Sequence, residues 1–398
     1  MNEPNIQTLL YIGTTLVGDL NKFAKNRKLS EHLKSEQESA KCDQFTFDVN
    51  WKKFKELAAI KFDDDPMSFL RVGKTHVVLV TDGLVRFAGF QAARPARVGL
   101  GPEQVLSLTF YEHFARLSGD LVCDPADKNS PYRTFTDRPA HLYVQDLISE
   151  FKARAAAAGE TINWTAGVVN TLANKTFEYK DFQTISKALC DAMNNVEGAG
   201  KFDVVLRTDP ADYTHQFVDI LKPRGRDKNI TIKYPSDGVY TLWSSDYEIE
   251  ETNVYASEVL VSGNGQVGNP DAGEDTAPLG AATNASFAAE YCYWRAYDSQ
   301  SNLSSQAAVD AQAAKTLAQR DFGLQVPKIK LVGRPIVWGD ADNDDNGLAI
   351  GDSFLFQDTN DDGANQSGRL RIIGMETDYD DNGVATVEPA LLRVETEE

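Results

Sequence analysis

Residues 72–117 carry the clearest local order in the sequence, and they constrain the fold more than any other stretch. An apolar, β-branched run at 76–80 leads into Thr81-Asp82-Gly83, the Asp-Gly signal of a tight hairpin, and a second strand follows at 84–90. A third run of strand character occupies 105–110. The stretch therefore predicts a small antiparallel sheet that runs into a short helical piece, and it contains no catalytic motif.

The hydrophobic period changes from two to 3.6 near Asp137, which predicts an α+β unit after the first strands. Asp137 resembles a helix N-cap with a proline close behind it, and the helical pattern stops at Gly159. A second helix is predicted to begin at Asp181 and to end before Gly198. The run at 202–206 then reads as a strand.

The last third of the chain combines one helix with short strands. Ser304 is a plausible cap for an alanine-rich helix over residues 304–320. The strands that follow are predicted at 328–332, 335–338, 352–356, 370–375 and 385–388.

Several of these segments, in this order, resemble the tail-hub or baseplate-hub proteins of tailed bacteriophages. The segments are Phe87-Ala88-Gly89-Phe90 with the strand at 106–110, Lys175-Thr176-Phe177, Phe202-Asp203-Val204, residues 252–263, and the turn Gly351-Asp352 after an alanine-rich helix. The resemblance covers most of the chain.

This resemblance implies an α+β fold with two β-barrel-like domains and an α+β domain between them. The expected limits are 1–120 for the first barrel-like domain, 121–225 for the α+β domain, and 226–398 for the second barrel-like domain, which includes the helix at about 304–320. The implied role is structural and not enzymatic, and it implies no cofactor. Ca²⁺ is the one ion to consider, at three Asp/Asn-rich loops near the C-terminus. A homotrimer would join the tail tube or distal tail protein to tail-tip or fibre proteins, as part of the virion baseplate. DNA would pass through it during ejection without specific binding, and the protein would be made in the host cytoplasm.

The charge distribution agrees with a surface that repels nucleic acid. The formal net charge is −19, and residues 340–398 hold 16 acidic and 3 basic side chains. Such a surface repels phosphate, which disfavours groove-reading recognition of DNA or RNA. A conduit through which DNA slides would benefit from this sign on its wall. The alternative is that the acidic turns simply lie on the outer rim.

Three Asp/Asn-rich loops near the C-terminus reproduce the first six positions of a calcium-binding loop. The twelfth position should supply a glutamate, but it is Ser353, Arg369 and Pro389 in the three loops. Asp/Asn-Gly is also the preferred sequence of a tight hairpin, so both Ca²⁺ binding and plain turns remain open. The candidate ligands are Asp342, Asp344, Asn346, Asp358, Asn360, Asp362, Asp378, Asp380 and Asn382.

Other signals argue against common functional classes. The string 263–268 fits GxGxxG, but Asn269-Pro270 follows where a dinucleotide fold needs a helix. The four cysteines form no CxxC pair, which favours free, mostly buried thiols. No run of about 18 apolar residues is present, so we expect no membrane span. The N-terminus lacks a charged segment followed by an apolar one, so we expect no secretory signal.

Two further classes compete with the structural role. A glycoside hydrolase would need paired carboxylates, and aspartates in hairpin turns are poor candidates for a buried acid. A β-rich carbohydrate-binding module would need an exposed aromatic platform, for which the candidates are Trp243, Tyr247, Tyr291, Tyr293 and Trp294.

Overall fold

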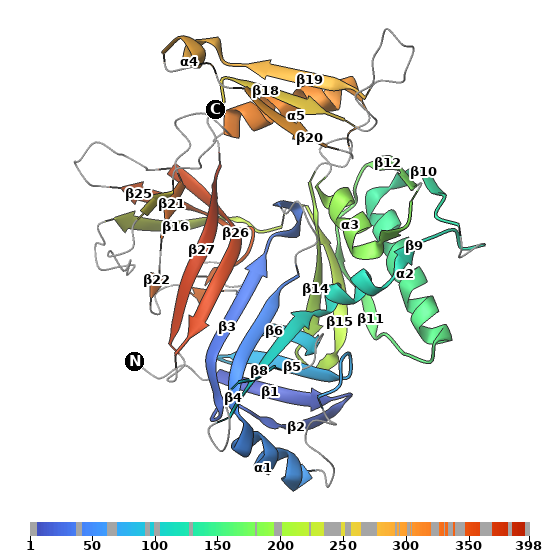
Figure 1. Cartoon of the computed structure of the whole chain (residues 1–398), viewed down its shortest axis with the longest axis vertical. Coiled ribbons are helices and arrows are strands. Elements are labelled where there is room, and N and C mark those ends of the chain that lie inside the picture. The colour runs from blue at the N-terminus through green and yellow to red at the C-terminus, as the bar shows by residue number, and fades with distance from the viewer. Residues whose placement is uncertain are drawn as a thin grey trace.

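A computed structural model of the chain shows a mostly β protein built around one large sheet (Figure 1). It describes residues 6–36, 42–61, 70–91, 96–98, 104–126, 130–179, 181–194, 201–222, 224–234, 248–250, 256–263, 277–290, 293, 295–300, 303, 305–319, 326–329, 331–332, 337–338, 347–358, 368–380 and 384–394. The sheet has 13 strands, and its main path runs β16-β25-β26-β3-β4-β8-β6-β5-β1-β2.

The N-terminal strands alternate buried and less buried side chains, as half-buried antiparallel strands should. The predicted hairpin is confirmed: Asp82 and Gly83 both have positive φ, 53° and 85°, as the turn between its strands requires. The elements of this part are β1 (Ile6–Ile12), β2 (Thr15–Asp19), β3 (Ala24–His32), η1 (Lys34–Glu36), β4 (Gln44–Asn50), α1 (Trp51–Lys61), β5 (Thr75–Thr81), β6 (Leu84–Gln91), β7 (Ala96–Val98), β8 (Val105–Glu112) and η4 (His113–Gly119).

The α+β unit follows and appears in green in Figure 1. Its helices pack on one core that includes Tyr143, Leu147 and Leu189, all fully buried. The elements are β9 (Leu121–Val122), β10 (Arg133–Pro139), α2 (Ala140–Ala157), β11 (Trp164–Val169), β12 (Asn174–Tyr179), β13 (Gln183–Thr184), α3 (Ile185–Met193), β14 (Asp203–Asp209) and β15 (Asp212–Leu221).

Both predicted helix starts in this unit were wrong, whereas the end of α2 at Gly159, with φ +84°, was right. Asp137 does not cap α2, because it lies at an irregularity of β10 with φ 45°, and Pro139 still pairs with β12. The second helix begins at Ile185, four residues later than predicted. Thr184 caps it by accepting a 3.3 Å hydrogen bond from the Lys187 N–H.

The C-terminal strands join the same sheet, because β26 pairs with β3 in antiparallel register from Gly374↔His32 to Tyr379↔Arg27. In Figure 1 the red strands lie beside the blue β3. We call the β26–β3 pairing the seam. The strands of this part that belong to the large sheet are β16 (Asp227–Tyr234), β22 (Leu331–Val332), β25 (Ser353–Asp358), β26 (Gly368–Tyr379) and β27 (Ala385–Arg393). Two separate two-stranded sheets pair β17 (Glu248–Glu250) with β21 (Val326–Lys328) and β23 (Val337–Trp338) with β24 (Gly347–Leu348).

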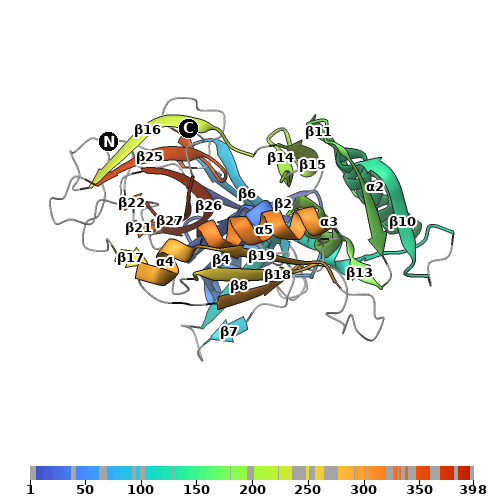
Figure 2. The same cartoon turned by 90° about the horizontal axis from the view of Figure 1, so that it is seen from above.

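A small separate unit lies at the top of Figure 1, and Figure 2 shows α5 running along one side of its sheet. The elements are β18 (Glu258–Ser262), β19 (Leu279–Thr283), α4 (Ala285–Glu290), β20 (Arg295–Ser299) and α5 (Gln306–Gln319), with strand order β19-β18-β20. The predicted cap Ser304 lies outside the described residues. Ser305 has the capping role, since its Oγ accepts from the Ala308 N–H at 3.3 Å. Of the GxGxxG string, only Gly263 is described, at the end of β18.

The described residues form four hydrophobic clusters: one inside the N-terminal strands, one in the α+β unit, one under the C-terminal strands and one between α5 and its sheet. The β-rich character of the expected fold is confirmed. Cluster membership does not fix domain limits, so the limits 1–120, 121–225 and 226–398 stay predictions. Within the described part of the chain, no helix is both long enough and apolar enough to cross a membrane.

Candidate functional site

A buried cluster of charges lies where the N-terminal sheet meets the α+β unit. Lys34 in η1 and Glu112 at the end of β8 form an ion pair of 2.7 Å, with side chains only 1% and 10% exposed. The Asp43 N–H donates to Glu112 Oε1 at 2.9 Å, and Asp43 Oδ1 accepts from the His32 N–H at 2.8 Å. We call Lys34, Asp43 and Glu112 the charged junction.

The three charges of the junction hold one another in place electrostatically. Burial alone would lower the pKa of Lys34, but the carboxylates of Asp43 and Glu112 outweigh it and raise that pKa above its ordinary value. Burial and the neighbouring Asp43 raise the pKa of Glu112. Asp43 shifts the other way, because Lys34 and the bonds from His32 outweigh its burial and lower its pKa. The junction therefore holds together the segments that meet there, and its charged groups are paired with one another.

The turn that carries Lys34 also reaches the α+β unit. The Ser35 N–H and hydroxyl donate to the two carboxylate oxygens of buried Asp203 at 3.1 and 2.7 Å. One short turn thus ties β8 of the large sheet to β14 of the α+β unit. Cys42 and Cys190 lie in the same region, and burial raises the pKa of both thiols, that of Cys190 to about 12. Such thiols are poor nucleophiles near neutral pH.

A second buried ion pair lies at the seam. Arg86 of β6 donates to Glu31 of β3 at 2.8 Å, and both side chains are largely buried. Glu31 is itself opposite Met375 of β26. Burial would lower the pKa of Arg86, but Glu31 and Tyr379 together raise it, so the guanidinium stays charged where the N-terminal and C-terminal strands join.

A chain of polar side chains crosses the three-stranded sheet β11-β15-β14. His215 Nδ1 lies 3.0 Å from Asp209 Oδ2, and its Nε2 lies 2.8 Å from Thr165 Oγ1. The order is that of a hydrolytic triad. Asp209 also accepts from the Ala211 N–H at 2.9 Å and so closes the β14–β15 turn, which favours a structural role.

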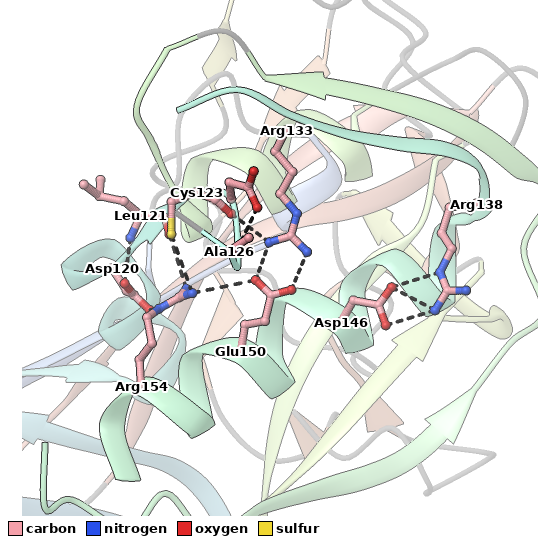
Figure 3. A network of polar contacts seen from close by, with 10 residues as sticks. Asp120, Leu121, Cys123, Ala126, Arg133, Arg138, Asp146, Glu150 and Arg154 are labelled. Carbon is pink, nitrogen blue, oxygen red and sulfur yellow. Dashed lines mark hydrogen bonds and ion pairs between the residues drawn. The ribbon is translucent and has the colours of Figure 1, made fainter. Parts of the chain in front are cut away.

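Further ion pairs fasten helix α2 to the segments around it (Figure 3). Arg154 Nε donates to Asp120 Oδ2 at 2.8 Å and also lies 3.7 Å from Glu150, which pairs in turn with Arg133. Arg133 Nη1 donates to the Cys123 carbonyl oxygen at 2.9 Å. These pairs connect β10 and the segment after β9 to one face of α2, so the network stiffens the unit.

Comparison with known proteins gives the fold a context. No family model and no curated protein matches the sequence. Solved structures do match along nearly the whole chain. A tail protein from Neisseria meningitidis MC58 matches at TM-score 0.59 and 14% identity, covering 98% of this chain and 97% of that one. The 43 kDa tail protein of prophage MuSo2 from Shewanella oneidensis matches at TM-score 0.58 and 10% identity, covering 97% and 98%. Prophage tail protein gp18 from Listeria monocytogenes EGD-e matches at TM-score 0.51 and 12% identity, covering 98% and 95%.

The chain has the fold of phage tail proteins. The resemblance inferred from loose motifs is confirmed at this level. In this tail-protein fold, the charged junction and the seam ion pair lie between parts of the chain that are far apart in sequence. Both ion pairs therefore hold together segments that are distant along the chain.

Most of the predicted metal ligands in this tail-protein fold cannot be placed. Asp342, Asp344, Asn346, Asn360, Asp362 and Asn382 lie outside the described residues, and only the backbone of Asp358, the last residue of β25, is described. Asp378 and Asp380 are exposed at the end of β26. Asp380 Oδ1 accepts from the Val384 N–H at 2.7 Å, which closes the β26–β27 hairpin. Among the described residues, no group of three or more His, Cys, Asp or Glu could hold a metal ion. Calcium binding stays a prediction.

Sequence reasoning missed the charged junction altogether. Lys34 lies next to three polar residues, and nothing local distinguishes it from a solvated lysine. Its partner Glu112 is 78 positions away, so only the pairing of β4 with β8 brings the two together. One signal was available: Glu112 ends an alternating apolar strand at a position that should face the core.

Proposed function

We propose that this protein is a structural tail hub or baseplate hub that joins a phage tail tube to tip or fibre proteins. The observation that carries the proposal is the match of fold along 98% of this chain and 97% of a tail protein. The proposed role is structural and not enzymatic, in the tail tip of a virion whose parts are made in the host cytoplasm.

The finer architecture that we propose is two β-barrel-like domains in each chain, with the α+β domain between them. Two separate cores support this, one under the N-terminal strands and one under the C-terminal strands of the same sheet. Three chains would then present six similar surfaces, which lets a trimer dock on a sixfold tube. The two strands at the ends of the described sheet path, β2 and β16, offer edges that neighbouring subunits could cover.

We further propose that part of the acidic surface faces a central channel. The net charge of −19 supports a wall that repels DNA phosphates, so that DNA passes without specific binding. Salt would screen this repulsion over roughly 8 to 10 Å. If the acidic loops of residues 340–398 instead lie on the outer rim, Ca²⁺ binding is their alternative use.

The mass in solution tests the assembly directly. Light scattering at micromolar concentration should give about 132 kDa, three times the chain mass of 43.9 kDa, and electron microscopy should show rings. A monomer of single-chain mass under these conditions, with no ring, would contradict the hub proposal. A ring whose lumen is neutral or basic would contradict only the channel argument.

A further inference from the structure

The three-stranded sheet β19-β18-β20 has one covered face and one open face. Val259 and Val261 of β18 are fully buried against α5, where they meet Val309 and Ala313. Strand geometry sends alternate residues to the opposite face. On that face Tyr297 is 58% exposed and Leu279 is 47% exposed, so no second layer built from the described residues covers them.

The strand register defines the members of the open face. Leu260 is opposite Tyr297 on one side and Ala281 on the other, and Glu258 is opposite Arg295. Tyr293, 59% exposed, lies just before β20 and contacts the same pair. We use "open face" for Glu258, Leu260, Leu279, Tyr293, Arg295 and Tyr297.

Hydrogen bonds fix both tyrosines at their hydroxyl ends and leave the rings exposed. Tyr297 Oη lies 2.6 Å from Ser262 Oγ, and the Tyr293 hydroxyl donates to Glu258. An exposed tyrosine normally samples several rotamers, so these bonds reduce the conformational entropy that a ligand would otherwise have to remove. The rings are therefore arranged in advance as flat apolar surfaces.

A charged pair lies beside the Tyr293 ring, and its Arg295 precedes Tyr297 by two residues in β20. Arg295 Nε and Nη2 donate to Glu258 at 2.9 and 3.0 Å, a bidentate geometry. The Arg295 guanidinium centre lies 5.8 Å from the Tyr293 ring centroid, and its side chain is 54% exposed. The pair cancels its own charge, so this patch is neutral on a strongly acidic chain. Its remaining donors and acceptors can bind hydroxyl groups.

The area of the open face indicates whether its ligand is a protein or a small molecule. Strands of 5 residues span about 16 Å, and three strands span about 14 Å, giving roughly 220 Å². A stable protein interface needs about 800 Å² from each partner. The open face is too small for that, but it matches two or three sugar rings.

We propose that the open face binds a neutral oligosaccharide of two or three pyranose units. The apolar C–H face of a pyranose ring packs on an aromatic ring, and its equatorial hydroxyls point sideways toward polar groups. Tyr293 and Tyr297 supply the rings, and Glu258 and Arg295 supply the acceptor and donors. The inference does not rest on the proposed hub role, because it uses only contacts within this small unit.

Titration of the full chain with chitotriose, cellotriose and maltotriose, each followed separately by calorimetry and NMR, tests the proposal. At least one trisaccharide should bind saturably in the millimolar range or below. Tyr297→Ala and Tyr293→Ala should each weaken binding about tenfold, the upper end for loss of one aromatic contact. Tyr297→Phe, which keeps the ring, should retain most of the affinity.

Tyr132→Ala is the matched control, since Tyr132 is also highly exposed but lies before β10 in another unit. Its binding should equal that of the wild type, and the melting temperatures of all variants should agree. Absence of binding by all three trisaccharides overturns the proposal. So does an equal loss in Tyr132→Ala. If no sugar binds and Tyr297→Ala lowers the mass in solution, the open face is a contact between chains instead.

Discussion

The guanidinium of Arg27 donates a 2.8 Å hydrogen bond to the carbonyl oxygen of Asp380, a residue 353 positions further along the chain. Arg27 is almost fully buried, and it lies opposite Tyr379 where β3 pairs with β26. The bond marks the seam, at which the first and last parts of the chain become one sheet.

Replacing Arg27 by methionine should destabilise the protein by about 1.5 to 3 kcal/mol, because a charged donor is lost while the apolar stem is kept. The midpoint of urea unfolding measures the effect. Lys52→Met on the exposed face of α1 is the control, and we expect it to change stability by less than about 0.5 kcal/mol. An unchanged midpoint for Arg27→Met would mean that the bond adds nothing to the seam.

Lys34→Met should cost about 3 to 5 kcal/mol, because it leaves two buried carboxylates without their cation. Adding Glu112→Gln to this variant should restore part of the loss, since one of the unpaired charges is then removed. Denaturant unfolding of the wild type, both single variants and the double variant measures this coupling. Strictly additive losses would show that the two side chains do not interact.

The stacked pair His76 and His113 should make stability fall in mild acid. Burial lowers the pKa of His76 to about 4 and that of His113 to about 3, below the ordinary value of 6.5. Between pH 6.5 and these values the unfolded chain binds more protons, so the stabilising contribution is complete above 6.5 and is lost as pH falls. The slope is at most about 1.4 kcal/mol per pH unit for each histidine.

His113→Phe should remove part of that slope while leaving the carboxylates untouched. Unfolding free energies at intervals between pH 7 and pH 4 give the measurement, with wild type and variant compared at each pH. Parallel curves for the two proteins would show that His113 does not contribute to the acid response.

Gly351→Ala should be strongly destabilising, whereas Gly119→Ala should be tolerated. Gly351 has φ +94°, and an added Cβ would lie 2.4 Å from the Arg224 carbonyl oxygen. The strained backbone alone costs about 1 to 3 kcal/mol. A Cβ on Gly119 meets nothing within 4 Å. Thermal melts of both variants decide the matter, and equal melting temperatures would contradict this packing of Gly351 on the segment before β16.

Asp380→Ala should cost about 0.5 to 1.5 kcal/mol through loss of the hydrogen bond from Val384. If the hairpin is a plain turn, the loss is the same in millimolar Ca²⁺ and in chelator. Ca²⁺ binding to the native state alone would instead raise the melting temperature of the wild type and not of the variant. The comparison of both proteins in both buffers separates the two cases.

Local signals predicted local structure well. Asp82-Gly83 fixed the β5–β6 hairpin, because those two residues accept the positive φ angles that the turn needs. Gly159 likewise ended α2 as expected. The failures came where tertiary pairing overrode propensity. Asp137 looked like a cap, yet pairing of β10 with β12 continues through Pro139 and delays the helix.

Long-range relationships could not be derived from the sequence. Nothing in the sequence around Gly374 indicates that β26 pairs with β3, and nothing around Lys34 indicates its two acidic partners. The sequence indicated one member of the open face, because Tyr293 was a candidate for an aromatic platform. The other four platform candidates, Trp243, Tyr247, Tyr291 and Trp294, lie outside the described residues. Tyr297 was missed because alternating aromatics in strands usually face a core.

The seam also sets the order of events during synthesis. While β3 emerges early from the ribosome, its partner β26 is made only in the last tenth of the chain, so the edge of β3 stays unpaired for most of translation. Unpaired edges and contacts of high sequence separation slow folding and favour aggregation. This edge of β3 therefore stays open to mispairing until residues 368–379 have left the ribosome, so the sheet can close at the seam only after those residues are made.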